Sequence, residues 1–305
     1  MKLEGIHHIT AITENAQRNV DFYVGVLGLR LVKKTVNQDN PTVYHLFYAD
    51  EEGDAGSDLT FFEYPGAAPG RAGAGMVHRI VWRVASGDAL DFWGERLRAH
   101  DTESERDGNS LVFSDPEGLD HELLVVDVPD QPLIADHPEV PGEMALQGFH
   151  AVRVYAPSPE ASSGLLEALE FRQVDGAWEA RGDKRGGLYV YDEAPAERGI
   201  QGAGSVHHVA WASTPDQLLD WREKAVAGGA QPTPEIDRFY FRSIYFREPS
   251  GVLFEIATLG PGFTVDEPLE SLGEKLSLPP DFEHLREEVE PRLRPVVNPR
   301  VQAQG

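Results

Sequence analysis

Cysteine, positive charge and long apolar runs are all scarce in this sequence. The absence of cysteine excludes disulfides, thiolate nucleophiles, zinc–thiolate sites and iron–sulfur clusters. No run approaches the ~20 apolar residues of a membrane span, and the start, MKLEGIHH, has no apolar stretch of signal-peptide length. The 27 basic residues are outnumbered by 51 acidic ones. A net charge of −24 repels nucleic acid and anionic membranes, so we expect a protein that binds neither. Because it shows neither a signal peptide nor a membrane span, we expect it in the cytoplasm.

An internal repeat organises the chain of 305 residues. Four segments share an apolar residue, a histidine and a β-prone run, and each is followed by apolar residues at helical spacing and then by short β-rich runs. This order predicts an α+β fold of four βαβββ modules, paired into two half-open barrel domains, with a C-terminal tail. The four segments are IHHITAIT (6–13), VHRIVWRV (77–84), FHAVRVYA (149–156) and VHHVAWAS (206–213).

The domain boundaries follow from the repeat and from a Pro-rich, acidic linker. We expect an N-terminal domain over 1–130 with modules 1 and 2, and a linker over 131–147. A C-terminal domain over 148–260 holds modules 3 and 4, and 261–305 is an extension. In the fourth module, Thr214 before Pro215 predicts a helix N-cap.

Two strand histidines and one strand glutamate predict a metal site. Side chains alternate faces along a strand, and His8, His208 and Glu255 each share a face with small or apolar neighbours. A lone carboxylate in such surroundings is costly to bury, and a divalent cation with two imidazoles removes that cost. Two histidines and one carboxylate leave three positions open, which favours non-haem Fe(II), with Mn(II) as the nearest substitute.

The other histidines leave alternatives open. His78, His150 and Glu122 form a second metal site or are relics of a duplicated unit. His7 and His207 stand next to the proposed ligands, where they orient the ligands, relay protons or merely cap exposed strand edges.

These motifs resemble the vicinal oxygen chelate superfamily, which includes glyoxalases, bleomycin resistance proteins and dioxygenases. The resemblance covers residues 1 to about 260, and the chain is most similar to ring-cleaving dioxygenases of the hydroquinone-cleaving branch. The segments that carry the resemblance are GIHHIT (5–10), TVYHLFYAD (42–50), VHHVAW (206–211) and DRFYFRSIYFREPSGVLFEIAT (237–258), with LGEKLSLPP (272–280) in the tail.

The resemblance implies that modules 1 and 4 hold one Fe(II) between them and that the substrates are an aromatic diol of the hydroquinone type and O2. His8, His208 and Glu255 match the ligand positions of the family. The positions that line its substrate pocket match Tyr245, Arg238, His7, His207 and Thr10. Arg238 and Tyr245 are seven residues apart, so a bend or turn must separate them if both reach the pocket.

Two other functions compete with this interpretation. Glu63 occupies in module 1 the place that Glu255 occupies in module 4. If Glu63 reaches the metal, two histidines and two carboxylates suit Ni(II) or Zn(II) and a glyoxalase-like isomerase. A non-catalytic protein that binds an aromatic ligand or drug is the second competitor. A homo-oligomer is left open.

Overall fold

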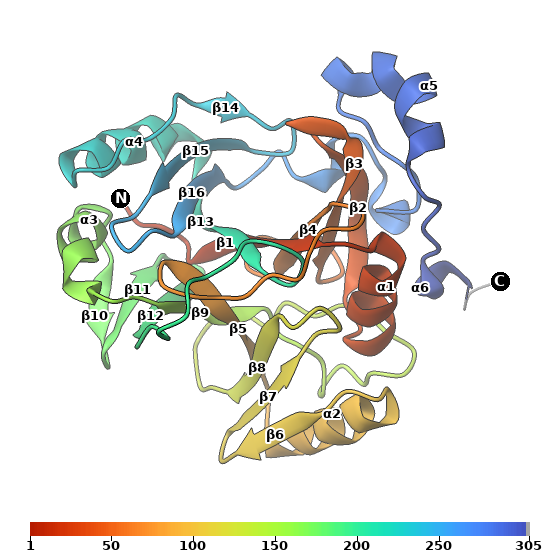
Figure 1. The fold of residues 1–305 in the computed structure, drawn as a ribbon, viewed down its shortest axis with the longest axis horizontal. Helices are drawn as coiled ribbons and strands as arrows, with labels where there is room; N and C mark the ends of the chain where they lie inside the picture. Colours follow the sequence, from red (N-terminus) through yellow and green to blue (C-terminus); the bar gives the residue numbers. More distant parts are fainter. Residues whose placement is uncertain (303–305) are drawn as a thin grey trace.

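The computed structural model describes residues 1–302 and confirms the α+β fold. Figure 1 shows two mixed sheets, with the helices on their outer sides. The first sheet takes its strands from modules 1 and 4 and curls into a half-barrel. Its eight strands, in spatial order, are β14 (Ile236–Asp237), β15 (Arg242–Arg247), β16 (Leu253–Thr258), β13 (Val206–Ser213), β1 (Ile6–Thr13), β4 (Asp58–Glu63), β3 (Asn40–Ala49) and β2 (Arg30–Asn37).

The second sheet is built from modules 2 and 3, and its strands follow the same spatial order within each module as those of the first sheet. In both sheets, the first strands of two modules pair antiparallel at the centre, and the last strand of each module pairs parallel with its first. That residues 1–130 and 148–260 are separate domains joined by a linker over 131–147 stays a prediction. The second sheet runs β10 (Arg172–Val174), β11 (Ala177–Arg181), β12 (Gly186–Asp192), β9 (Phe149–Tyr155), β5 (Met76–Val84), β8 (Asp120–Val125), β7 (Ser110–Ser114) and β6 (Ser104–Asp107).

Each module contributes one helical segment that packs an apolar stripe against its sheet. In α2 the buried residues include Leu90, Trp93 and Leu97, as the helical spacing predicts. Thr214 is the N-cap residue in extended conformation and Pro215 begins the helical segment, as predicted, although the Thr214 side chain makes no capping hydrogen bond. The segments are α1 (Ala16–Val20) with η1 (Asp21–Val26), α2 (Gly87–Ala99), η2 (Pro159–Ser162) with α3 (Ser163–Ala168), and η3 (Pro215–Gln217) with α4 (Leu218–Ala227).

The C-terminal extension packs on the half-barrel of its own chain. The buried Lys33 ammonium contacts Asp266 at 2.7 Å and also pairs with Glu267. Arg300 reaches Glu51 at 2.7 Å near the end of the described chain. The extension contains η4 (Phe263–Val265), η5 (Leu269–Ser271), η6 (Pro280–Leu285), α5 (Arg286–Val289), η7 (Glu290–Arg292) and α6 (Pro299–Gln302).

The buried apolar side chains form two clusters. The larger cluster fills the space between the sheets and their helices. The smaller one, with Phe47, Tyr240, Phe241 and Phe263, lies inside the half-barrel. No helix among residues 1–302 has the length and apolar character needed to cross a membrane.

Candidate metal centre and its cavity

Strand register brings His8, His208 and Glu255 together. In the antiparallel pair β1 and β13, His8 lies opposite Ala210 and Thr10 opposite His208. In the parallel pair β13 and β16, Ala210 lies opposite Glu255. Residues two apart in a strand share a face, so all three polar side chains project from the same face of three adjacent strands. The small Ala210 between them leaves the space that they converge on.

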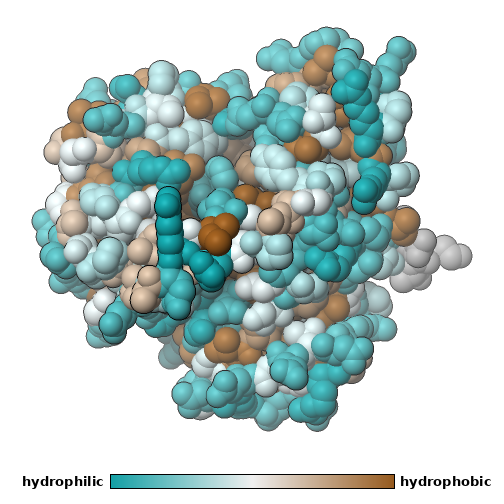
Figure 2. Space-filling model, viewed as in Figure 1, coloured by the Kyte–Doolittle hydropathy of each residue, from teal (hydrophilic) through white to brown (hydrophobic). Residues whose placement is uncertain are grey.

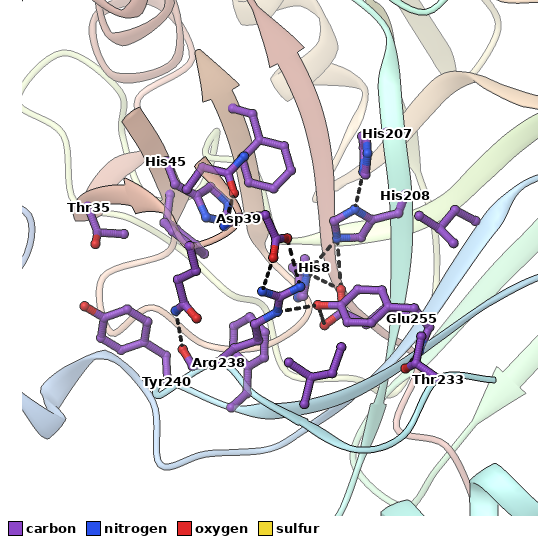
Figure 3. Close-up of a pocket in the computed structure, with 18 residues that line it drawn as sticks. His8, Thr35, Asp39, His45, His207, His208, Thr233, Arg238, Tyr240 and Glu255 are labelled. Carbon is purple, nitrogen blue, oxygen red and sulfur yellow. Dashed lines mark hydrogen bonds and ion pairs between the residues drawn. The ribbon is translucent and has the colours of Figure 1, made fainter. Parts of the chain in front are cut away.

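The three side chains form a compact, buried group (Figure 3). The Nε2 atoms of His8 and His208 lie 3.1 and 2.9 Å from Oε2 of Glu255, and 3.3 Å from each other. No side chain of the three is more than 6% exposed. Within the described part of the chain, this is the one group of three or more potential ligands close enough to hold a metal ion.

The neighbouring His7 determines how His8 is presented. His7 Nε2 lies 3.2 Å from the carbonyl oxygen of Thr258, which only accepts, so this nitrogen carries the proton. Burial, with His8 as a second cause, lowers the pKa of His7 to about 3, so the ring is neutral and its Nδ1 is an acceptor. His8 Nδ1, 2.9 Å away, is then the donor. With the proton on Nδ1, the neutral form of His8 directs the lone pair of Nε2 at Glu255.

The second doublet repeats this contact on β13. His207 Nδ1 lies 2.8 Å from His208 Nδ1, and burial, with His208 as a second cause, lowers the pKa of His207 to about 4. The ring of His207 also lines the cavity described below. In both doublets the outer histidine contacts the ring nitrogen of the inner one that faces away from Glu255, an arrangement common around metal-binding imidazoles.

The donor set suits a divalent cation. Oε2 of Glu255 is buried and faces the Nε2 atoms of His8 and His208. Burial works to raise the pKa of Glu255, but the charge of His8 and hydrogen bonds from both histidines outweigh it and hold the pKa well below the usual range. An ionised carboxylate therefore faces two imidazole nitrogens. Because ligands must lose their protons to a metal, a bound cation competes with any proton shared among these three groups.

The other carboxylate oxygen, Oε1 of Glu255, is held by the protein. Tyr245 lies opposite Glu255 in the pairing of β15 with β16, and its hydroxyl donates to Oε1 at 2.9 Å. Ser243 Oγ donates to the same oxygen. Arg238 Nε donates to the Tyr245 hydroxyl at 3.2 Å. Burial and the Glu255 charge raise the pKa of Tyr245, so the phenol is a neutral donor here.

A tight turn places Arg238 and Tyr245 at the same cavity. The chain reverses between β14 and β15, where Phe239 has a left-handed backbone with φ of 71°. Asp237 Oδ1 accepts a hydrogen bond from Phe239 N at 2.7 Å, which stabilises the turn. The spacing of seven residues thus spans a reversal of the chain.

A cavity of about 290 Å³ opens beside the group. It is lined by His8, His208 and Glu255, by Tyr245, Arg238 and His207, and by aromatic rings from several strands. His45 on β3, which the sequence pattern did not single out, also lines this cavity, and its ring lies between Phe47 and Phe62. Strand alternation in the motif TVYHLFYAD could have indicated it, because His45 and Phe47 share a face.

His7 and Thr10 lie behind the cavity wall and do not line it. Thr10 Oγ1 is 2.7 Å from Thr60 Oγ1, and Thr60 Oγ1 is 2.9 Å from His45 Nε2. His7 reaches the cavity through His8, as described above. His7 is therefore separated from the cavity by one side chain, His8, and Thr10 by two, Thr60 and His45.

Two further carboxyl groups on β4 lie outside the metal-binding group. Glu63 Oε1 accepts from the backbone N–H of Ala16 at 3.0 Å, five residues along the strand from the position opposite His8. Asp58 occupies that position, but its buried oxygens have no hydrogen-bond partner. Burial raises the pKa of Asp58 to about 8, so it is protonated near neutral pH. Neither residue adds a second carboxylate ligand.

The histidines and glutamate of the second sheet do not assemble. His78 Nε2 contacts Asp192 at 2.8 Å, and its ring stacks on Tyr155. Glu122 accepts from Ser110 Oγ at 2.8 Å and contacts Arg79 at 3.4 Å. His78, Glu122 and His150 therefore form no second metal-binding group among residues 1–302.

Comparison with known proteins places these features in a family. The model of the Glyoxalase/Bleomycin resistance protein/Dioxygenase superfamily matches residues 5–123 and 147–256. The chain is 39% identical to "Putative ring-cleaving dioxygenase MhqA" of Bacillus subtilis (strain 168), over 97% of this chain and 100% of that protein. It is 36% identical to "Chlorohydroquinone/hydroquinone 1,2-dioxygenase" of Sphingobium indicum, over 94% and 95%.

A solved structure agrees with these matches. The crystal structure of a "putative dioxygenase" from Bacillus subtilis subsp. subtilis str. 168 superposes with a TM-score of 0.90 at 38% identity, and the match covers 97% of this chain and 98% of that one. The chain belongs to the glyoxalase, bleomycin resistance protein and dioxygenase superfamily.

Proposed function

We propose that the chain is a non-haem Fe(II)-dependent ring-cleaving dioxygenase that acts on a hydroquinone-type aromatic diol with O2. The observation that carries the proposal is the buried group of two histidines and one glutamate beside an aromatic-lined cavity. The name of the Sphingobium relative, a hydroquinone 1,2-dioxygenase that aligns over 94% of this chain, supports the substrate class.

His8, His208 and Glu255 are the residues that would hold the metal. Two imidazoles and one carboxylate are the donor set typical of non-haem Fe(II) oxygenases, and Mn(II) accepts the same donors. Iron held there would supply Lewis-acid and redox chemistry: it would lower the pKa of a substrate hydroxyl and allow electrons to pass between the diol and O2.

The side chains around Glu255 are proposed to prepare the reaction. Tyr245 and Ser243 donate to Oε1 of Glu255, which leaves Oε2 directed at the metal position. Arg238 acts on this group through its Nε–H, which donates to the Tyr245 hydroxyl and so holds the phenol in place to donate to Glu255.

The histidine doublets are proposed to hold the metal ligands in one tautomer. His7 accepts from Nδ1 of His8, and His207 contacts Nδ1 of His208. Such outer contacts orient a ligating ring and raise its basicity. Thr10 contributes through Thr60 to the orientation of His45, whose ring faces the cavity.

The cavity favours a small aromatic ligand. Its volume of about 290 Å³ is at the lower end of ligand pockets, and the rings of Phe47, Phe62, Tyr240 and Phe241 form much of its wall. Aromatic walls favour a flat ring through stacked and edge contacts. A diol with one ring, unsubstituted or with small substituents, is the substrate class that we propose.

The glyoxalase-like isomerase needs a second carboxylate ligand, but the Glu63 carboxylate accepts a hydrogen bond from the backbone of Ala16 and does not reach the metal-binding group.

The direct test of the dioxygenase loads the chain with Fe(II) without oxygen, adds methylhydroquinone, chlorohydroquinone or catechol, and follows O2 with an electrode. We expect O2 consumption in proportion to ring cleavage with a hydroquinone. Binding of the diol without O2 consumption would support the ligand-binding alternative and overturn the dioxygenase.

A further inference from the structure

The hairpin tip between β2 and β3 reaches across the cavity mouth to Arg238. Asp39 Oδ1 and Oδ2 accept from Nη1 and Nη2 of Arg238 at 3.2 and 3.1 Å, and Figure 3 shows the carboxylate facing the guanidinium. Gln38 Nε2 donates to the backbone oxygen of Arg238 at 2.8 Å. Two elements about two hundred residues apart thus meet at this one arginine.

Asp39 occupies the outer edge of the Arg238 guanidinium. The inner nitrogen, Nε, is engaged with Tyr245. The two outer nitrogens form the fork that binds a carboxylate in two parallel contacts, and Asp39 fills that fork. The side chain of Arg238 is 18% exposed, whereas that of Asp39 is 73% exposed. The fork is therefore directed from the cavity toward its mouth.

Arg238 is the only lysine or arginine among the described residues that line the cavity. A carboxylate on the ring of a bound diol would need these two nitrogens of Arg238 as its partner. Because Asp39 already occupies them, the ring carboxylate would instead be repelled by the negative charge of Asp39. An uncharged substituent meets neither obstacle. Specificity of this kind arises from a repulsive element as much as from an attractive one.

We propose that Asp39 is a specificity-determining residue: by neutralising Arg238 at the mouth, it makes the cavity select diols with uncharged ring substituents over diols with a ring carboxylate. This inference rests on the proposed function, since it takes the cavity to be the site of a hydroquinone-type diol. It adds a determinant of substrate choice to that function.

The hairpin tip is held by contacts that do not involve the Asp39 side chain. Asn37 Oδ1 accepts from the backbone N–H of Asp39 at 2.9 Å, and Asn37 Nδ2 donates to the Tyr64 hydroxyl at 3.2 Å. The contact from Gln38 to the backbone of Arg238 also remains. Replacing Asp39 by asparagine therefore changes the charge at the mouth and leaves the tip in place.

The test compares Asp39→Asn with Asp91→Asn. Asp91 is an exposed aspartate paired with Arg106 at the second sheet, so its replacement removes the same charge far from the cavity. Each protein is loaded with Fe(II) without oxygen, and calorimetry measures the Kd of methylhydroquinone and of 2,5-dihydroxybenzoate. We expect Asp39→Asn to shift the ratio of the two Kd values by about tenfold toward the carboxylate, through tighter binding of 2,5-dihydroxybenzoate. Asp91→Asn should leave the ratio unchanged.

An unchanged ratio in Asp39→Asn, or an equal shift in Asp91→Asn, would overturn the inference. If wild-type protein binds methylhydroquinone but consumes no O2, the dioxygenase proposal fails, while the Kd ratio still decides the role of Asp39. If no variant binds either diol, both proposals are overturned. The binding readout thus separates the failure of one proposal from the failure of the other.

Discussion

The two sheets of this chain carry histidines and a glutamate at matching places of the same repeat, but only the first sheet brings them together. In the first sheet, Glu255 faces two imidazoles, and no lysine or arginine within residues 1–302 contacts its carboxylate. In the second sheet, Glu122 has Ser110 and Arg79, and His78 has Asp192.

The difference shows that residue types alone do not make a metal site. A buried carboxylate needs a compensating charge or hydrogen bonds. The second sheet provides that compensation internally, with Arg153 on Asp192 and with Arg83 and Arg181 on Asp130. In the first sheet, Oε2 of Glu255 faces only two imidazole nitrogens among the described residues, an arrangement that suits a cation.

The largest expected effect is on metal affinity, when Glu255 of the first sheet and Glu122 of the second are each replaced by glutamine. Glu255→Gln removes the only ionised ligand, so its affinity for Fe(II) should fall by more than the ~100-fold that the loss of an outer contact costs. Glu122→Gln should bind metal as wild type does. Metal analysis after anaerobic loading and dialysis measures both, and equal metal content in the two variants would contradict the comparison.

The second effect concerns the stability that ion pairs give to the second sheet. Asp130, whose side chain is 1% exposed, contacts Arg83 and Arg181 at 2.6 Å each. Asp130→Asn leaves the buried Arg83 without its ion-pair partner and should lower the free energy of unfolding by about 3 kcal/mol. Urea unfolding of the metal-free protein measures this. The exposed pair gives the control, because Asp91→Asn should cost less than ~0.5 kcal/mol; similar losses in both variants would argue against the pairing.

The third effect sharpens the role of the histidine doublets. His7→Phe keeps a buried ring beside Phe241 but removes the acceptor for Nδ1 of His8. We expect metal affinity to fall about 10-fold to 100-fold with the fold intact by circular dichroism. His78→Phe makes the same change in the second sheet and should leave metal affinity as it is. Unaltered affinity in His7→Phe would show that the doublet has no part in holding the ligand.

The smallest effect is a pH dependence that belongs to the second sheet. His121 is buried between Trp82 Nε1 at 3.1 Å and the Tyr23 hydroxyl at 2.9 Å, and burial lowers its pKa to about 3. When the pH is lowered from 6.5 to 5.5, the unfolded chain takes up a proton at this residue and the folded chain does not. The free energy of unfolding therefore decreases by about 1 kcal/mol over this range.

His121→Gln removes this contribution. Urea unfolding of the metal-free variant should therefore show a pH dependence over this range that is smaller by about 1 kcal/mol, whatever its absolute stability. An identical slope in wild type and variant would mean that His121 titrates alike in both states.

Much of this architecture could be predicted from local pattern. The spacing of Leu90, Trp93 and Leu97 marks the buried stripe of α2, and strand alternation assigns His8, His208 and Glu255 to faces of their strands. The contacts of His45 and Asp39 were not predicted. Asp39 is an ordinary turn residue in the sequence, and its partner Arg238 is 199 positions away.

The sequence by itself determined the repeat, the strands that carry histidine, and the face of each strand on which a polar side chain lies, because these depend on periods of two or about four residues. Only the tertiary structure decided which of those strands became neighbours and which carboxylate an arginine reached. The pairing of β1 with β13 across two hundred residues places one glutamate in a group that suits a metal ion and leaves the other in an ion pair, since register and counter-charge are properties of the assembled sheets.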